Sequence, residues 1–296
     1  MNIHIPSEST LGAVVTDLDV PNISDSEFQR IYTLFLERSV VVFKQVHIDQ
    51  EEHIRFSRRF GRLERTLSKR TSRPEISLLS NVTKEGQIAK PDEVLGLFLK
   101  GNRYWHSDSS FKVVGAKASL LRAVEVPNEG GDTEWADMTA SWEALDQREK
   151  DALEGLYAIH SYEYSQSLIG GLGILKSAEL EDLPPVEHPV VRTHPETGRK
   201  CLYLGRHISH VRGMEFKASQ DLVGSLTDVA CRAPRLFRHQ WDDGDVVIWD
   251  NRCVLHRGYP WPFDQPRVMR RTTVAGEGDN PWILDEETQA STSQVG

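Results

Sequence analysis

Cysteine is scarce in this sequence. The chain of 296 residues contains three, Cys201, Cys231 and Cys253, and no two of them form a Cys-x-x-Cys pair. Their number and spacing argue against a disulfide framework or a structural zinc cluster. Cys253 and His256 do form a Cys-x-x-His pair, but a second pair of ligands is missing, so we interpret Cys253 as a buried thiol.

Excess basic charge and long apolar runs are also absent. Lys and Arg number 35 against 44 Asp and Glu, a formal net charge of -9, which argues against binding to the nucleic-acid backbone. No apolar run approaches the roughly 18 residues of a membrane helix, and the first residues lack the positive start and apolar core of a secretory signal. We therefore expect a cytoplasmic protein that binds neither nucleic acid nor membrane.

Short strand-like segments dominate what is present. No repeat or linker divides the chain, so we expect a single domain over residues 1–296, with a polar tail from about residue 280. Helical insertions are predicted near 139–158 and 215–232. The lack of strict βα alternation favours a mainly β fold of the antiparallel sandwich or jelly-roll type. The predicted strands cover residues 40–43, 76–80, 118–126, 190–193, 201–204, 246–250 and 267–275.

Two early helices have clear start signals. Ser24 followed by Glu27 forms a capping box before the first. Asp49 followed by Glu52 does the same before the second, and Gly61 is its expected C-cap.

The pattern His-x-Asp/Glu occurs three times, at residues 47–49, 106–108 and 194–196. Asp49 has a structural explanation, because a helix N-cap carboxylate is occupied by backbone N–H groups. The third copy contains Pro195 and is followed by Gly198, which predicts a hairpin turn. The copy at 106–108 lies in a stretch with β character, where residues two apart project from the same face. His106 and Asp108 are therefore candidate ligands on one strand.

A third ligand has to come from elsewhere in the chain, and His256 is the candidate. It follows a predicted strand, 150 residues after His106. Two histidines and one carboxylate are the ligands of the facial triad of non-haem Fe(II) oxygenases, which leaves coordination positions open. From spacing alone, a zinc site or no metal at all also remains possible.

The segment RVMRRTTVAG, from residue 267, places two arginines on one face of a predicted strand. Arg267 and Arg271 alternate with the opposite-facing Arg270, and lie about 13 Å apart at roughly 3.3 Å per residue. That spacing suits two separate anions, so the pattern is consistent with a protein that binds two small acids. Ion pairs with surface carboxylates are the alternative.

Together, these motifs resemble the Fe(II)/2-oxoglutarate-dependent taurine/2,4-dichlorophenoxyacetate dioxygenase (TauD/TfdA) family. The resemblance rests on His106-x-Asp108 with His256 150 residues later, and on GGDTEWADM at 130–138, WDNRCVLHR at 249–257 and PRVMRRTTVAGEG at 266–278; it runs from about residue 10 to 278. It is strongest toward the 2,4-dichlorophenoxyacetate and phenoxypropionate branch, through WHSDSSFK at 105–112, PPVEHPVVRTHPETGRK at 184–200 and WDNRCVLHRG at 249–258. The resemblance implies a double-stranded β-helix, or jelly-roll barrel, with Fe(II) held by His106, Asp108 and His256.

The same resemblance implies how the small molecules bind. Thr133 and Arg267 match positions that hold the two carboxylates of 2-oxoglutarate, with Thr133 nearer the metal. Arg271 matches the position that receives the anionic group of the substrate, and Asn102 one that approaches substrate or cosubstrate. The substrate-selecting walls are expected in residues 62–100 and 162–182, where the resemblance is less clear.

The implied reaction is hydroxylation of a C–H next to an ether oxygen. An aryloxyalkanoate would be cleaved to a phenol and a 2-oxo acid, with O2 consumed and succinate and CO2 formed, and ascorbate is expected to be supportive. The alternatives are a taurine, sulfonate or alkyl sulfate dioxygenase, and a non-catalytic β-barrel that binds a metal or an acid. We also expect a homo-oligomer.

Overall fold

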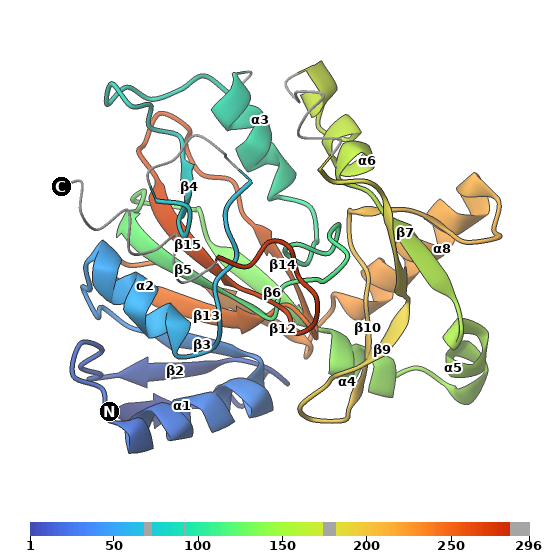
Figure 1. Ribbon diagram of the computed structural model, residues 1–296, viewed down its shortest axis with the longest axis horizontal. Coiled ribbons are helices and arrows are strands. Elements are labelled where there is room, and N and C mark those ends of the chain that lie inside the picture. Colours follow the sequence, from blue (N-terminus) through green and yellow to red (C-terminus); the bar gives the residue numbers. More distant parts are fainter. Residues whose placement is uncertain (68–72, 92, 174–181, 285–296) are drawn as a thin grey trace.

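Two β-sheets form the centre of the molecule (Figure 1). The structure is a computed structural model that describes residues 1–67, 73–91, 93–173 and 182–284. A seven-stranded sheet has the order β1-β2-β3-β13-β5-β15-β4, and a three-stranded sheet has the order β12-β6-β14. The strands of these two sheets are β1 (Asn2–His4), β2 (Ala13–Thr16), β3 (Val40–Phe43), β4 (Ser77–Ser80), β5 (Ala118–Glu125), β6 (Thr133–Asp137), β12 (Leu236–His239), β13 (Val246–Asp250), β14 (Val254–Gly258) and β15 (Val268–Val274).

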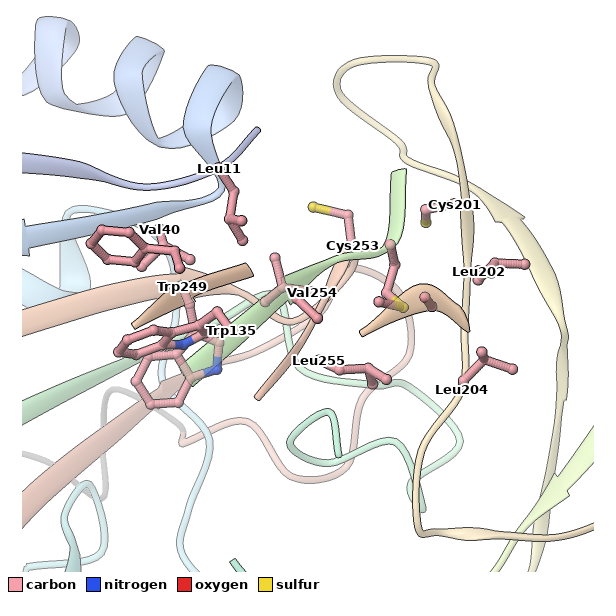
Figure 2. Close-up of a cluster of buried hydrophobic side chains, with 14 of the residues drawn as sticks. Leu11, Val40, Trp135, Cys201, Leu202, Leu204, Trp249, Cys253, Val254 and Leu255 are labelled. Carbon is pink, nitrogen blue, oxygen red and sulfur yellow. The ribbon is translucent and has the colours of Figure 1, made fainter. Parts of the chain in front are cut away.

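The two sheets pack face to face through large side chains. Trp135 of β6 lies against Trp249 of β13, with ring centroids 5.8 Å apart, and both tryptophans are almost completely buried. Figure 2 shows this pair beside the aliphatic side chains of Val254 and Leu255. Apart from β2 with β3, the strand pairs of these sheets are antiparallel. The expected jelly-roll architecture is confirmed.

Two helices cover the outer face of the seven-stranded sheet. These are α1 (Asp25–Arg38) and α2 (Gln50–Arg58), and both predicted capping boxes are present. Their apolar side chains join a second core with the outer face of β3 and β13. Gly61 is not the C-cap of α2, because the helix ends at Arg58 and Arg59 caps it in the right-handed region. Gly61 instead closes the following turn by donating its N–H to the Arg58 carbonyl.

A long excursion joins β6 to β12 and forms a separate layer (Figure 1). The predicted helix near 139–158 is two short helices, and it is wrong at its end, because residues from Tyr157 form a strand that pairs on both edges. The helix predicted near 215–232 is confirmed. The excursion contains α4 (Met138–Glu143), α5 (Gln147–Leu153), β7 (Tyr157–His160), α6 (Tyr162–Ser167), the 3-10 helix η1 (Gly171–Gly173), β8 (Val186–Pro189), β9 (Val191–Thr193), β10 (Lys200–Leu202), β11 (Ile208–Val211) and α8 (Phe216–Ala230).

The C-terminal boundary differs from the prediction of a polar tail from about residue 280. Trp282 and Leu284 are buried, and the backbone of this segment bonds to that of Leu63 and Arg65. The remainder, 285–296, lies outside the described residues. None of the helices in the described part of the chain combines the length and the apolar character needed to cross a membrane.

Candidate active site

His106 and His256 lie side by side through their backbones. Each donates its N–H to the carbonyl of the other, at 3.0 Å and 2.8 Å, which makes an isolated antiparallel bridge. Because β14 carries His256 and is anchored on β6, the bridge fixes His106 to the three-stranded sheet. The imidazole rings lie 4.1 Å apart between centroids. The structure thus brings together two residues that are 150 positions apart in the sequence.

The strand predicted around His106 is wrong in form. Only the bridge at His106 is extended pairing, and Asp108 already belongs to a turn that continues through Ser109 in the left-handed region at φ 58°. The expectation that His106 and Asp108 reach the same space nevertheless holds. Nε2 of His106 lies 3.9 Å from Oδ1 of Asp108, and Nε2 of His256 lies 3.8 Å from Oδ2.

These three side chains are suited to a metal ion. One nitrogen or oxygen of each lies within 4.8 Å of the other two, and all three residues are buried. Nδ1 of His106 lies 2.8 Å from the Tyr104 carbonyl, which assigns the proton to Nδ1 and leaves the Nε2 lone pair free. Burial, followed by the neighbouring histidine, lowers the pKa of His106 well below its ordinary range, and burial lowers the pKa of His256 to about 4. Both imidazoles are therefore neutral, as metal ligands have to be.

Outer hydrogen bonds orient the Asp108 carboxylate. Ser119 of β5 donates its hydroxyl to Oδ2 at 2.7 Å, and the Asp108 N–H donates to Oδ1 of Asn251 at 3.2 Å. Asn251 also donates from Nδ2 to the Ser119 hydroxyl at 2.9 Å. Although burial alone raises the pKa of Asp108, the Arg271 guanidinium and the two histidines lower it well below its usual range. The carboxylate is therefore ionised and held in place.

A second group of potential ligands is already saturated. His194, Asp250 and Cys253 also bring ligand atoms within 4.8 Å of one another. However, Arg252 donates to both oxygens of Asp250, at 2.8 Å and 2.7 Å, and Nε2 of His194 lies 3.0 Å from Oδ2. Burial raises the pKa of the Cys253 thiol well above its ordinary value, in agreement with its interpretation as a buried thiol. Figure 2 shows this thiol among aliphatic side chains.

The other two His-x-acid patterns are structural, as predicted. Asp49 caps α2 and accepts the Glu52 N–H at 2.8 Å. Residues 194–196 lie in the hairpin between β9 and β10. From this hairpin, the Glu196 carboxylate forms salt bridges to Arg252 at 2.6 Å and to Lys117 at 3.1 Å.

A cavity of about 560 Å³, its open mouth included, lies next to the two histidines. That volume lies within the range of roughly 300–1,000 Å³ that is usual for small-molecule sites. Six of the seven residues predicted from the sequence line it, while Asp108 lines a neighbouring cavity of about 400 Å³ together with Arg271. The six are Asn102, His106, Thr133, His256, Arg267 and Arg271.

Arg267 is a buried cation with an unused donor. Its Nη2 donates to the Gly131 carbonyl at 3.0 Å, but the buried Nε–H has no partner among the described residues. Burial lowers its pKa to about 10, so it stays charged at neutral pH. Gly131 has φ 72°, and a Cβ there would lie 3.0 Å from this Nε, so a glycine is required beside the guanidinium.

Thr133 lies at the start of β6 with its hydroxyl already oriented. Trp241 donates its indole N–H to Oγ1 at 3.0 Å. The Thr133 oxygen is therefore an acceptor toward the tryptophan, and its own hydrogen is free to be donated to a ligand. Asn102 caps the C-terminus of α3 (Val94–Gly101), and its carbonyl accepts the Gly258 N–H at 2.7 Å.

Arg271 lies between the two cavities. Its Nη1 donates to Oδ1 of Asp108, a partner that the sequence did not predict. The opposite-facing Arg270 bonds to Gln50 of α2, which agrees with the predicted alternation along β15. The role of Arg271 in substrate binding stays a prediction.

The second cavity contains a buried ion pair. Nζ of Lys112 lies 2.5 Å from Oε2 of Glu64, and Ser109 donates to the same oxygen at 2.9 Å. Lys112 also lies over the ring of Trp282, 4.3 Å from its centroid.

Sequence reasoning missed the residues that support the ligands. Asn251 lies in the quoted WDNRCVLHR block, so its position next to a ligand strand was a usable signal. No such signal in the sequence pointed to Ser119 or Trp241, because each reaches the site from a strand or loop that carries no predicted ligand.

The comparisons with known proteins agree with this geometry. A sequence model of the family described as "Taurine catabolism dioxygenase TauD, TfdA family" matches residues 4–273. The chain belongs to this family of dioxygenases.

Two relatives and one solved structure are particularly similar. The chain is 39% identical to an (S)-phenoxypropionate/alpha-ketoglutarate-dioxygenase of Sphingobium herbicidovorans, over 92% of this chain and 94% of the relative. It is 40% identical to an alpha-ketoglutarate-dependent 2,4-dichlorophenoxyacetate dioxygenase of Cupriavidus pinatubonensis, over 91% and 96%. The crystal structure of AAD-2 in complex with Mn(II) and N-oxalylglycine superimposes with a TM-score of 0.86, at 34% identity, over 94% of this chain and 99% of that one.

Proposed function

We propose that this protein is an Fe(II)- and 2-oxoglutarate-dependent dioxygenase that hydroxylates the C–H next to the ether oxygen of an aryloxyalkanoate. One oxygen atom of O2 enters the substrate as the hydroxyl group, and the other enters succinate, which forms from 2-oxoglutarate with loss of CO2. The resulting hemiacetal or hemiketal breaks down to a phenol and a 2-oxo acid. The observation that carries the proposal is the group of His106, Asp108 and His256 beside a cavity lined by Arg267, whose buried Nε–H has no partner among the described residues.

The donor set fits Fe(II). Two neutral imidazoles and one carboxylate would hold the ion on one side and leave the other positions for ligands. Bound Fe(II) supplies oxygen activation coupled to the decarboxylation of 2-oxoglutarate. The chain contributes orientation: Ser119 and Asn251 hold the Asp108 carboxylate, and the Tyr104 carbonyl holds the His106 ring.

Arg267 and Thr133 suit the two carboxylates of 2-oxoglutarate. A desolvated guanidinium with a free N–H is strongly favoured to bind an anion, and Arg267 has such a donor at the cavity wall. The Thr133 hydroxyl, fixed by Trp241, has its hydrogen free to donate to the carboxylate nearer the metal.

The substrate class rests on the relatives. Those that are 37–40% identical act, by their names, on phenoxypropionate or 2,4-dichlorophenoxyacetate. Their substrates are small anions, and we assign Arg271 and Asn102 to the substrate side of the site. The cytoplasmic location and the homo-oligomer expected from the sequence remain predictions, as does a supportive role of ascorbate.

Succinate release with a panel of candidate substrates tests the proposal. The panel contains 2,4-dichlorophenoxyacetate, both enantiomers of a phenoxypropionate, taurine and an alkyl sulfate, each with Fe(II), 2-oxoglutarate and ascorbate. We expect aryloxyalkanoates to stimulate succinate release most, with equal amounts of phenol formed, and a chelator to abolish it. Stimulation by taurine or alkyl sulfate instead would replace the substrate class. Acid binding without any Fe(II)-dependent turnover would favour a non-catalytic binding protein.

A further inference from the structure

Two arginines lie directly opposite each other on adjacent strands of the seven-stranded sheet. Arg122 of β5 and Arg270 of β15 are partners in the antiparallel register, and such partners project from the same face of a sheet. That face is the outer one, because Leu120, two residues before Arg122, belongs to the core that the sheet shares with α1 and α2. The two arginines therefore lie on the opposite side of the sheet from the proposed active site.

Neither guanidinium has a negatively charged partner in the described part of the chain. Arg122 donates from Nη1 to the Ile48 carbonyl, and Arg270 donates from Nη1 to the side-chain oxygen of Gln50. Both of these acceptors are neutral. The Nε–H of Arg122 is buried and makes no hydrogen bond with the described residues. Because like charges directly opposite in a sheet destabilise it, the pair lacks the counter-charge that would balance it.

Two acidic residues lie within electrostatic reach of Arg122, but both have another role. Burial and then the charge of Arg270 lower the pKa of Arg122, and the opposing effect of Asp49 and Glu52 is smaller. These two acids form the capping box of α2, in which Asp49 accepts the Glu52 N–H at 2.8 Å and Glu52 accepts the Asp49 N–H at 2.7 Å. They therefore offset the charge of the arginine pair only in part.

A third polar group without a partner lies close by. His53 of α2 is fully buried, and its Nδ1 makes no hydrogen bond with the described residues. Burial, followed by the charges of Arg122 and Arg270, lowers the pKa of His53 to about 3, so the ring is neutral and lies within electrostatic reach of both guanidinium groups. Unfilled buried polar atoms are rare in folded proteins, and several of them together indicate that a bound species completes them.

The arginine pair is accessible from the edge of the sheet. Leu78 of the edge strand β4 pairs with Arg270 and is 60% exposed. Val124, two residues after Arg122 on β5, is 40% exposed. A tetrahedral oxyanion with two negative charges offers enough oxygens for both guanidinium groups at once, whereas a carboxylate has oxygens for a single bidentate contact. The pair therefore suits a small tetrahedral ion that enters from this edge.

We infer that Arg122 and Arg270 form a binding site for a doubly charged tetrahedral oxyanion of the sulfate or phosphate type. The site lies on the outer face of the sheet, and it does not depend on the proposed function. The bound oxyanion links β5 to β15, the strand whose inner face carries Arg271. It supplies the counter-charge that the chain itself does not.

Titration of sodium sulfate by calorimetry tests this inference. The full chain is loaded with Mn(II) and N-oxalylglycine to fill the inner cavity, and sodium chloride keeps the ionic strength constant. We expect Arg122→Gln and Arg270→Gln each to weaken sulfate binding by about 30-fold or more, as is typical when charge-assisted hydrogen bonds are lost. Arg270→Lys keeps part of the affinity, because it retains the charge without the planar fork. The control Arg212→Gln, at an exposed arginine paired with Glu187, keeps all of it.

Urea denaturation with and without sulfate separates an anion site from a structural role. Without sulfate, Arg270→Gln should unfold at the same urea concentration as wild type or at a higher one, because the repulsion within the pair is relieved. With saturating sulfate, the wild-type midpoint should rise above that of the variant, since the ion binds only the folded wild type. Sulfate also stabilises proteins by exclusion from their surface, so the difference between the two proteins is the readout.

Three results would overturn the inference. These are a wild-type protein that binds no sulfate, an equal response of wild type and Arg270→Gln to sulfate, and loss of sulfate affinity in Arg267→Gln but not in Arg270→Gln, which would place the anion in the inner cavity. Inorganic phosphate, titrated without Mn(II), identifies the preferred ion as the one that binds more tightly. None of these measurements uses turnover, so failure of the proposed function leaves their outcome unchanged.

Discussion

Two buried groups of histidine and aspartate in this chain differ in one decisive respect. The atoms of His106, Asp108 and His256 are about as close together as those of His194, Asp250 and Cys253. In the second group, Arg252 occupies both oxygens of Asp250 and the histidine is bonded on both nitrogens. In the first, Nε2 of each histidine makes no hydrogen bond with the described residues, and both histidines line a cavity. Proximity of ligand-type residues is therefore not enough to identify a metal site. The cluster whose ligand atoms lack protein partners is the candidate.

The largest effect should come from removing a ligand of the first group. Asp108→Ala and His106→Ala should each weaken Mn(II) binding by at least about 100-fold, beyond the usual cost of losing an outer partner, and abolish turnover. His194→Gln is the matched change in the second group and should leave Mn(II) affinity within about threefold of wild type. Metal titration by calorimetry measures both. Full activity in either ligand variant would remove the first group from consideration as the site.

Breaking the second group should cost stability instead of metal affinity. Asp250→Asn leaves Arg252 and His194 without their buried carboxylate, and a broken buried ion pair destabilises by about 3 kcal/mol or more. Urea denaturation measures the loss, with Asp221→Asn, at an exposed pair with Lys217, as the control. If Asp250→Asn instead lost metal binding while keeping its stability, the roles of the two groups would be reversed.

Acid should remove the same stabilisation in wild type. Burial alone raises the pKa of Asp250. Hydrogen bonds from Arg252 and His194 outweigh this effect and lower the pKa from 3.8 to about 2. Because the pKa of Asp250 is lower in the folded protein, its ionised carboxylate stabilises the fold above about pH 4, and this stabilisation is lost as the pH falls toward 2. The contribution to the free energy of unfolding is roughly 2 kcal/mol. The difference in unfolding free energy between wild type and Asp250→Asn should therefore narrow over this range. A constant difference from pH 6 to pH 2 would contradict the assignment.

The smallest expected effect concerns the outer partners of the first group. Ser119→Ala removes the hydroxyl that donates to Asp108 and should weaken Mn(II) binding about tenfold, as is common for partners of metal ligands. Ser141→Ala is a suitable control, because Ser141 is equally buried but bonds only to the Asp137 and Ala230 carbonyls. Equal metal affinity in the two variants would show that the Ser119 contact has no role in orienting the carboxylate.

The sequence predicted those features that are local. The capping boxes at Ser24 and Asp49, the strands and the turn at residues 194–196 follow from patterns within a few residues, and the structure confirms them. The extended form predicted around His106 is wrong, because the pairing that holds this residue comes from His256 and not from neighbouring strand residues.

Pairing across the fold could not be predicted from one sequence. Alternation along β15 placed Arg267 and Arg271 at one cavity, but it could not reveal that Arg271 meets Asp108. The same holds for the free Nε–H of Arg267, since it depends on which side chains surround the guanidinium. The family resemblance identified the candidate metal ligands, whereas the supporting contacts of Ser119 and Trp241 required three-dimensional coordinates.

The reciprocal backbone hydrogen bonds between His106 and His256 have an evolutionary consequence. One antiparallel bridge sets the spacing of the two imidazoles, independently of the conformation of the chain between them. The intervening excursion, which contains β7 to β11, can therefore lengthen, shorten or change sequence without altering how the two histidines face each other. The residues that line the two cavities come from segments outside this excursion. The geometry of the reactive centre is therefore inherited independently of the excursion, and we expect changes of substrate to come from the segments that line the cavities.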